Sequence, residues 1–182
     1  MSKKQDILEA ALKIFTEFGT TAASTKSIAT EAHVSEALIF KHFKSKDNLI
    51  EEIMKTGYRE ATKLVSTYLE YKTPKDYISN LLDLPKILVL ANKDFWQMQY
   101  KIMPLNAMAV THHKLFMKPC NDFLVKAFAE LGYKRPVLEA EILLLFIEGL
   151  WKHIAAHEFD TGHIDEIIHL TKKKYGLMSA EK

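Results

Sequence analysis

The stretch that decides the fold is Ser35–Glu52, SEALIFKHFKSKDNLIEE. It reads as a short helix that ends near Phe43, followed at once by the start of another helix. The short helix mixes bulky apolar side chains with basic ones, so it is neither fully buried nor fully solvated. One of its faces must therefore pack against the protein, while the other is offered to a partner.

The segments before this stretch complete a small three-helix unit. The apolar residues of Ile7–Phe18 fall on one face of a helix, which Gly19 ends. Thr25 is a suitable N-cap for a second short helix, Val34 lies in a tight turn, and Ser35 is the next N-cap. Two short helices joined by a tight turn, with a preceding helix that closes the core, form a helix-turn-helix.

A helix-turn-helix places its second short helix in the major groove of DNA. Ile39 and Phe43 would then face the core, together with Ala29 and Phe15. Outward-facing residues would meet base edges, and the lysines that follow would lie near the phosphates, as would the free N–H groups of the helix that Ser45 caps. The predicted DNA-binding residues are Thr25, Lys26, Ser35, Glu36, Ala37, Leu38, Phe40, Lys41, His42, Lys44 and Lys46.

Residues 7–50 resemble the DNA-binding head of the TetR-type transcriptional regulators. The resemblance rests on ILEAALKIFTEFG from Ile7, on TKSIA from Thr25, and on VSEALIFKHFKSKDNL from Val34. It implies a homodimer in which the remainder of the chain binds a small ligand and releases the DNA operator when that ligand binds. The function predicted from it is a DNA-binding transcriptional regulator, specifically a repressor.

Two residues depart from the pattern of that family. Phe40 stands where a tyrosine is usual, so a hydroxyl that commonly reaches DNA is missing. His33 replaces the usual turn glycine, so a left-handed backbone is expected there, at an energetic cost for a residue other than glycine.

The rest of the chain has helical periodicity throughout and no clean strand pattern, which predicts an all-α fold. A long helix from Ser45 to about Tyr71 would join an N-terminal helix-turn-helix domain, residues 1–46, to a C-terminal helical domain for ligand binding and dimerisation, residues 47–182. Pro119 is expected to kink or split a later helix. The helices expected after the long one are 74–91, 93–108, 112–132, 136–157 and 162–175.

Residues 93–132 are rich in aromatic and methionine side chains. A stripe of this kind is most often simply core, but it can also line an adaptable apolar cavity with a few polar groups. The ligand of such a cavity would be a small apolar or amphipathic effector of unknown identity. The predicted lining residues are Trp96, Tyr100, Met103, Asn106, His112, His113 and Phe116.

The segment 136–157 is apolar nearly all round, and 162–175 adds further apolar residues. A helix of that kind is buried on most sides. Two such helices from each of two chains would form a four-helix bundle across a two-fold axis, which predicts a homodimer through 136–157 and 162–175. The alternative is a buried central helix in a monomer.

Other classes of site receive little support. His153 and His157 have a spacing that can bind a transition metal, but they also lie near a helix C-terminus, which favours histidine without any metal. No cofactor or metal is therefore predicted. No nucleophile–base arrangement and no glycine-rich phosphate loop occurs, so we do not expect an enzyme.

Composition places the chain in the cytoplasm. The single cysteine, Cys120, cannot form an internal disulfide, and the amphipathic N-terminus is not a signal peptide. The longest apolar run, Ile142–Ile147, is too short to span a membrane.

Residues 1–50 carry almost as many acidic as basic side chains and no arginine, so charge alone does not identify nucleic acid as the partner. A helical protein–protein interaction module without DNA binding therefore remains the alternative, and an enzyme built on a helical bundle is a weaker third.

Overall fold

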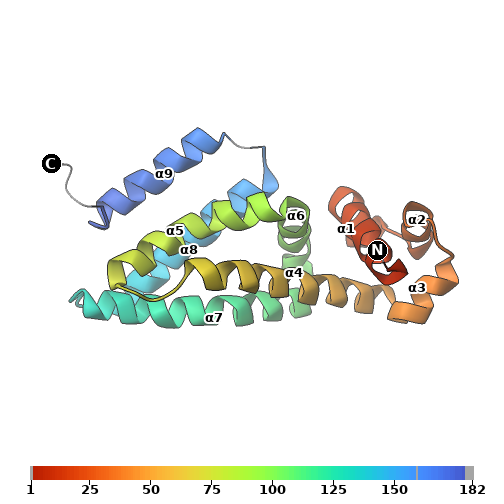
Figure 1. The fold of residues 1–182 in the computed structure, drawn as a ribbon, viewed down its shortest axis with the longest axis horizontal. Helices are drawn as coiled ribbons and strands as arrows, with labels where there is room; N and C mark the ends of the chain where they lie inside the picture. Colours follow the sequence, from red (N-terminus) through yellow and green to blue (C-terminus); the bar gives the residue numbers. More distant parts are fainter. Residues whose placement is uncertain (1, 159, 179–182) are drawn as a thin grey trace. The chain divides into compact units, whose positions relative to one another are not determined.

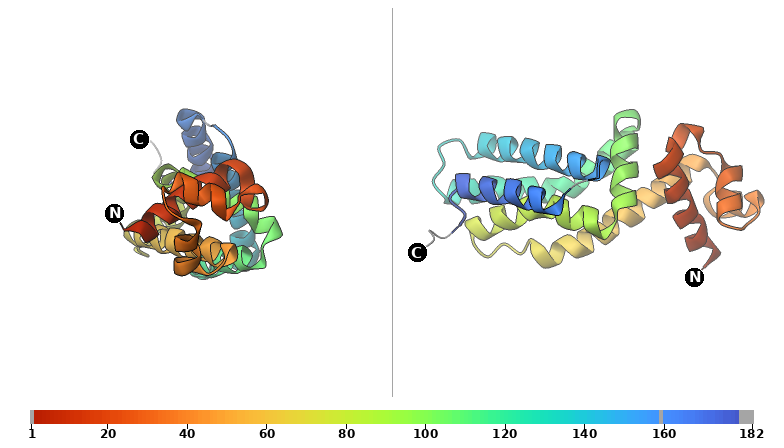
Figure 2. Two further views of the ribbon diagram at one scale, coloured as in Figure 1. Left: turned by 90° about the vertical axis from the view of Figure 1, so that its right-hand side faces the viewer. Right: turned by 90° about the horizontal axis from the view of Figure 1, so that it is seen from above.

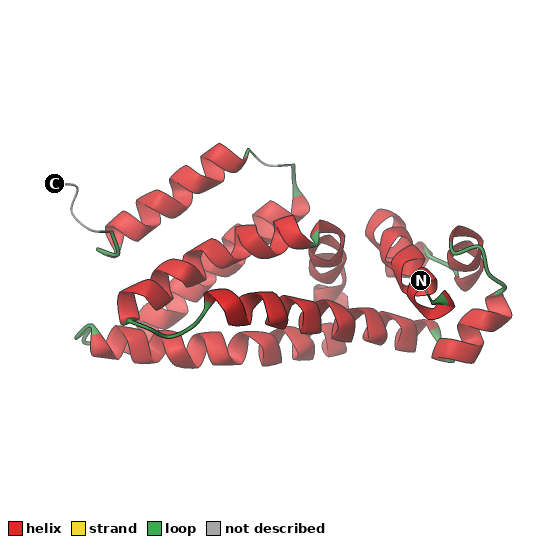
Figure 3. Cartoon of the chain, viewed as in Figure 1, coloured by secondary structure: helices red, strands yellow, loops and turns green. Residues whose placement is uncertain are grey.

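The structure is a computed structural model that describes residues 2–158 and 160–178 of the chain (Figure 1). Within these ranges the regular structure is entirely helical, which confirms the all-α fold class (Figure 3). The helices are α1 (Lys3–Ala22), α2 (Thr25–Glu31), α3 (Glu36–Phe43), α4 (Lys46–Tyr68), α5 (Pro74–Ala91), α6 (Lys93–Ile102), the 3₁₀ helix η1 (Met103–Leu105), α7 (Ala107–Glu130), α8 (Pro136–Ala156) and α9 (Thr161–Lys174).

The largest boundary error concerns the predicted helix 93–108. The observed helix, α6, ends at Ile102 and is followed by the 3₁₀ turn η1, which contains Pro104. Helix α7 begins at Ala107, five residues before the start expected for the helix 112–132. Local capping explains the early start, because the side-chain oxygen of Asn106 accepts hydrogen bonds from the N–H groups of Met108 and Ala109 at 3.0 and 3.1 Å. Pro119 lies within α7 and does not split it.

The described chain divides into two compact units. The first comprises the described residues of 1–60 and 92–113, and the second those of 61–91 and 114–182. Helices α4 and α7 each contribute residues to both units. These units follow packing and do not coincide with the ranges 1–46 and 47–182, so that functional division stays a prediction.

In the first unit, α1 packs against α2 and α6, and α2 packs against α3. Figure 2 shows α6 lying beside α1. The apolar stripe predicted for α1 supplies much of the core, and Phe15 is completely buried. The other fully or almost fully buried side chains of this unit include Ile7, Ala11, Ile28, Ile39, Leu49, Met54, Phe95 and Trp96.

Helix caps in the head confirm the sequence interpretation, with one correction. Ser35 and Ser45 cap α3 and α4, because their hydroxyl oxygens accept hydrogen bonds from the N–H groups three residues later. The N-cap of α2 is Ser24 rather than Thr25, because Ser24 forms a reciprocal capping box with Ser27. Thr25 is therefore the first residue of the helix.

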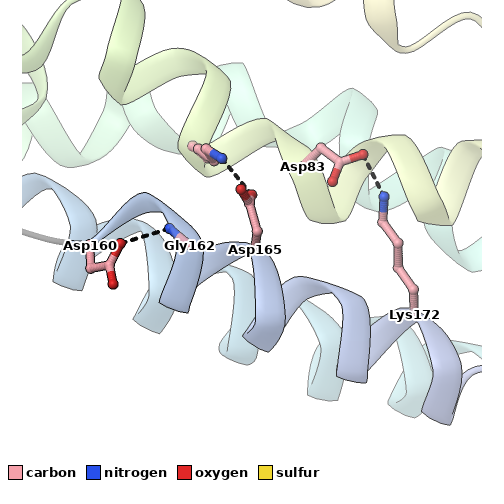
Figure 4. Close-up of polar contacts among 6 residues, drawn as sticks. Asp83, Asp160, Gly162, Asp165 and Lys172 are labelled. Atoms are coloured by element: carbon pink, nitrogen blue, oxygen red, sulfur yellow. Dashed lines mark hydrogen bonds and ion pairs between the residues drawn. The ribbon is translucent and has the colours of Figure 1, made fainter.

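In the second unit, α5 packs against α8 and α9. Ion pairs from α5 to α9 join Asp83 to Lys172, at 2.6 Å, and Lys86 to Asp165 (Figure 4). The carboxylate of Asp160 accepts a hydrogen bond from the N–H of Gly162 at 2.9 Å and caps α9. The side chains in the interior of this unit include Tyr77, Ile78, Leu81, Leu124, Phe128, Leu143, Ile147, Trp151 and Ile164.

Candidate nucleic-acid interface

Helix α3 has one buried face and one exposed face, as predicted. Ile39 and Phe43 are only 1% and 5% exposed, and they anchor the helix to the core of the head. Leu38 is half-buried. The exposed residues on and just beyond α3 are Glu36, Ala37, Phe40, Lys41, His42 and Lys44. An unusually exposed phenylalanine, Phe40 at 47%, lies among them.

The turn before α3 is held by local interactions. His33 adopts the left-handed backbone expected for it, with a φ of 52°. The hydroxyl of Thr25, at the start of α2, donates a hydrogen bond to the carboxylate of Glu36, in the first turn of α3. The hydroxyl of Ser35 is engaged in capping α3, and Lys26 is exposed. The structure therefore brings Thr25, Ser35 and Glu36 together, with Glu36 held toward α2.

The ammonium of Lys46 is engaged within the protein. It donates hydrogen bonds to the carbonyl oxygens of Thr20 and Ala23, at 2.8 and 3.1 Å, where α1 ends. A cation placed at the C-terminal end of a helix is stabilised by the carbonyl groups that have no partner within that helix. Lys46 thus holds α4 to the end of α1.

Lys44 is free where Lys46 is engaged. Its side chain is exposed and makes no ion pair in the described part of the chain, and its backbone is in a left-handed region, with a φ of 66°. It lines a surface groove of about 340 Å³ with Lys4, His42, Phe43, Asn48, Glu51, Glu52 and Lys55. The acidic residues of that groove are paired: Glu52 with Lys4 at 2.7 Å and Glu51 with Lys55 at 2.8 Å. Pairing with Lys55 lowers the pKa of Glu51.

The predicted ligand-binding residues are divided between the two units. Phe116 belongs to the second unit, whereas the other six belong to the first. Of those six, Asn106 caps α7, while Trp96 and Tyr100 are buried.

His113 and Met103 join a buried polar cluster that the sequence interpretation missed. Tyr58 Oη lies 3.0 Å from Nδ1 of His113, and Nε2 of Gln99 donates to Tyr58 Oη at 2.9 Å and to Sδ of Met103 at 3.2 Å. The ring of His112 stacks on that of Tyr58. The sequence did carry a signal for this cluster, because Tyr58 and Gln99 fall on otherwise apolar helical stripes.

A separate pocket of about 300 Å³ lies in the second unit, and it is strongly apolar. It contains Phe116 as the only one of the predicted lining residues. Burial raises the pKa of the Cys120 thiol to about 11 and, as the largest cause, raises that of Tyr77, so both groups remain neutral near pH 7. The lining residues are Thr62, Val65, Ser66 and Leu69 from α4 and its end, Tyr77 from α5, and Leu115, Phe116, Pro119, Cys120 and Phe123 from α7.

Helix α8 keeps an apolar surface that its own unit does not cover. Leu138, Ile142 and Leu145 are 38%, 57% and 69% exposed, and their spacing places them on one face. On α9, Leu170 is 53% exposed. Ile168 is only 4% exposed, so it packs inside the unit and is not part of this surface.

Comparison with known proteins assigns the family. Residues 7–53 match the family of bacterial regulatory proteins described as the tetR family. The HTH-type transcriptional regulator YvkB of Bacillus subtilis is 25% identical over 92% of this chain and 88% of its own length. The chain belongs to the TetR family of transcriptional regulators. It is thus a DNA-binding transcriptional regulator, and regulators of this family bind DNA operators and are dimeric.

Two further comparisons differ in how much of this TetR-family chain they cover. The HTH-type transcriptional repressor Rv3405c of Mycobacterium tuberculosis is 35% identical, but the match covers 42% of this chain and 39% of the repressor. The crystal structure of a transcriptional regulator from Aquifex aeolicus covers 96% of this chain and 99% of its own, with a TM-score of 0.74 and 21% identity. Similarity of fold therefore extends over 96% of the chain, whereas the stronger sequence identity to Rv3405c is confined to 42% of it.

Two other classes of feature are absent from the described ranges of this TetR-family regulator. No helix of residues 2–158 and 160–178 is long and apolar enough to cross a membrane. In the same ranges, no group of three or more histidine, cysteine, aspartate or glutamate side chains is placed to hold a metal ion. The rings of His153 and His157 are 5.3 Å apart.

Proposed function

We propose that this protein is a homodimeric cytoplasmic repressor, and not an enzyme, which a small apolar effector releases from its operator. The observation that carries the proposal is the two-sided character of α3. Ile39 and Phe43 fix that helix to the core, while Lys41 and His42 remain exposed on it and Lys44 follows at its end. A rigidly held helix with exposed basic and polar residues can enter a major groove without unfolding anything.

The proposed DNA contacts are divided by role. Residues on the outward face of α3 would meet base edges, and Lys41 among them can donate hydrogen bonds to guanine acceptors. Lys44 and His42 would contact phosphates, as would Lys26 on α2. Thr25 and Ser35 support α3 through the bonds to Glu36 and to the helix N-terminus. We leave Lys46 out of the contacting set, because its ammonium is bound to carbonyl oxygens.

Selection of bound fragments from a random DNA pool tests the DNA-binding role and gives the operator. We expect a sequence with two-fold symmetry, with half-sites about one helical turn, or roughly 34–36 Å, apart. Recovery of fragments with no common sequence would contradict specific operator binding. Phe40→Tyr, which adds a phenolic hydroxyl to an exposed ring, should tighten binding modestly if a phosphate lies within its reach.

We further propose that two copies associate through α8 and α9. The uncovered face of α8, Leu138, Ile142 and Leu145, can be buried against its symmetry mate, together with Leu170 of α9. A glutamate at position 145 would have to be desolvated in that interface. Leu145→Glu should therefore sediment as a monomer at concentrations where the unchanged protein is a dimer. Ile168→Glu is the contrasting variant, and it should unfold the unit because Ile168 is an interior residue.

The effector is proposed to occupy the apolar pocket of the second unit. None of its ten lining residues carries a charge, so a neutral apolar molecule suits it better than an ion. Helix α4 contributes Thr62, Val65 and Ser66 to this pocket and, at its other end, Lys46 to the head. A ligand that prefers one position of α4 would change the population of DNA-binding dimers, within its differential affinity for the two states.

A screen of neutral apolar compounds by thermal stabilisation, followed by operator binding, tests this assignment. Ser66→Phe should fill the pocket and abolish stabilisation by a compound that binds there, whereas Ser2→Ala, outside the pocket, should not. The effector proposal fails if every compound that Ser66→Phe excludes leaves the affinity for the operator unchanged.

A further inference from the structure

A third cavity lies entirely in the first unit, and neither DNA contact nor the apolar pocket uses it. It is a groove of about 260 Å³ between α1, α4 and the start of α6. Its lining residues are Gln5, Leu8, Glu9 and Leu12 from α1, Ile53, Thr56, Gly57 and Glu60 from α4, and Asn92 and Phe95 from α6 and its N-cap.

The inner surface of this groove is apolar. Leu8, Ile53 and Phe95 are 8%, 5% and 1% exposed, so their side chains form a fixed inner wall. Gly57 has no side chain at the point where the Phe95 ring approaches α4, and a Cβ atom there would lie 2.2 Å from that ring. The wall therefore consists of two aliphatic side chains and an aromatic ring, which together suit an apolar molecular body.

The outer edge of the groove is acidic. Glu9 and Glu60 are both exposed, and no lining residue is basic. Glu9 accepts a hydrogen bond from Nε2 of Gln5 at 3.0 Å, which leaves its charge uncompensated. Within the described ranges, neither carboxylate forms an ion pair. This contrasts with Glu51 and Glu52 of the neighbouring groove, each of which is paired with a lysine.

We propose that this groove binds a small organic cation that has an apolar body, such as an aryl- or alkylammonium ion. The two carboxylates would attract the ammonium group, while the apolar wall of the groove would contact the apolar part. An anion of the same shape would be repelled. A neutral molecule would gain only the apolar contact.

The guanidinium of Arg59, beside the groove, opposes this attraction. Nη2 of Arg59 lies 3.5 Å from the hydroxyl of Thr56, a lining residue. Arg59 is exposed, so water screens its effect. Replacing Arg59 should therefore have the opposite effect on cation affinity to replacing the carboxylates. Arg59→Gln should strengthen cation binding, whereas Glu60→Gln and Glu9→Gln should weaken it.

The test is isothermal titration calorimetry of the full-length protein with benzyltrimethylammonium. The comparison ligands are neopentylbenzene, its uncharged carbon analogue, and phenylacetate, an anion. We expect the cation to bind most tightly and phenylacetate not to bind. Glu9→Gln and Glu60→Gln should each weaken the cation by roughly fivefold at low salt, from the Coulomb energy of one charge pair in water. Binding should weaken further as salt is added.

Glu17→Gln is the matched control, because Glu17 is an exposed acid on α1 outside the groove and should leave affinity unchanged. Equal binding of cation and neutral analogue, absence of cation binding at millimolar concentrations, or indifference to both groove glutamates would each overturn the proposal. No DNA and no effector enters this experiment. Its outcome is therefore independent of the proposed repressor function.

Discussion

The backbone of Gly57 in α4 lies directly against the ring of Phe95 in α6. A Cβ atom at position 57 would be 2.2 Å from Cε2 of that ring, far closer than two carbon atoms can approach. Phe95 is almost fully buried and also contacts Tyr58 and Trp96 through edge-to-face ring packing. The ring is thus held from several sides, and an added methyl group at position 57 cannot displace it freely.

Gly57→Ala should accordingly destabilise the protein, although alanine is the better helix former. We expect the free energy of unfolding to fall by about 1–3 kcal/mol, the usual cost of overpacking a core. Chemical denaturation at a fixed protein concentration measures it. In a double-mutant cycle, Phe95→Leu should relieve part of the penalty, so that the double variant is more stable than the sum of the single changes predicts. Simple additivity would mean that contact with the ring is not the cause.

His33→Gly should stabilise the head. The φ of 52° places His33 in the left-handed region, which costs roughly 1–2 kcal/mol for a residue with a Cβ atom. Glycine removes that strain but loses more backbone entropy on folding, so a net gain of up to about 1 kcal/mol is expected. The midpoint of thermal unfolding reports it. His33→Ala keeps the Cβ atom and should give no such gain. If alanine and glycine behave alike, a property of the imidazole rather than backbone strain sets the stability.

Lys46→Met should lower stability far more than it lowers the salt dependence of DNA binding. Methionine keeps much of the apolar stem but loses both hydrogen bonds to the carbonyl oxygens of Thr20 and Ala23. Hydrogen bonds from a charged donor contribute about 1.5–3 kcal/mol, so a loss near the lower value is expected at this half-buried site. Urea denaturation measures the loss of stability, and operator titrations at several salt concentrations measure the salt dependence of DNA binding. An unchanged stability with a clearly flatter salt dependence would return Lys46 to the phosphate contacts.

Lys41→Ala and Lys44→Ala should weaken DNA binding in different ways. Lys41 is on the exposed face of α3, so its loss should cost about 1–3 kcal/mol on the selected operator and much less on a scrambled duplex. Lys44 follows the helix, so its loss should weaken both duplexes alike and reduce the salt slope by about 0.9. Anisotropy titrations of each variant on both duplexes measure this. Identical losses on both duplexes for Lys41→Ala would make it only another phosphate contact.

Local sequence determined the head. A serine N-cap, a basic and apolar octapeptide and a second serine N-cap specify α3 and the start of α4 within Ser35–Glu52, because caps and helical periodicity act over only a few residues. The same locality explains why Ile39 and Phe43 could be assigned to the core. The left-handed turn at His33 was expected instead from the family resemblance, because a glycine usually stands at that position. Locality also explains the small error at Thr25, since Ser24 and Thr25 are both adequate caps.

Tertiary structure decided which side chains are free to bind. Lys44 and Lys46 look equivalent in the sequence, yet only Lys46 meets the end of α1, twenty-odd residues earlier in the chain. Trp96, Tyr100 and Phe116 look like one aromatic lining, yet the first two are interior residues of the first unit while Phe116 lines a pocket of the second. Burial and ion pairing join residues that are far apart in sequence, and periodicity carries no information about such partners. The sequence by itself therefore determined the helices and the kind of head they form. Only the packing of those helices decided which charged side chains stabilise the fold and which groups line a cavity.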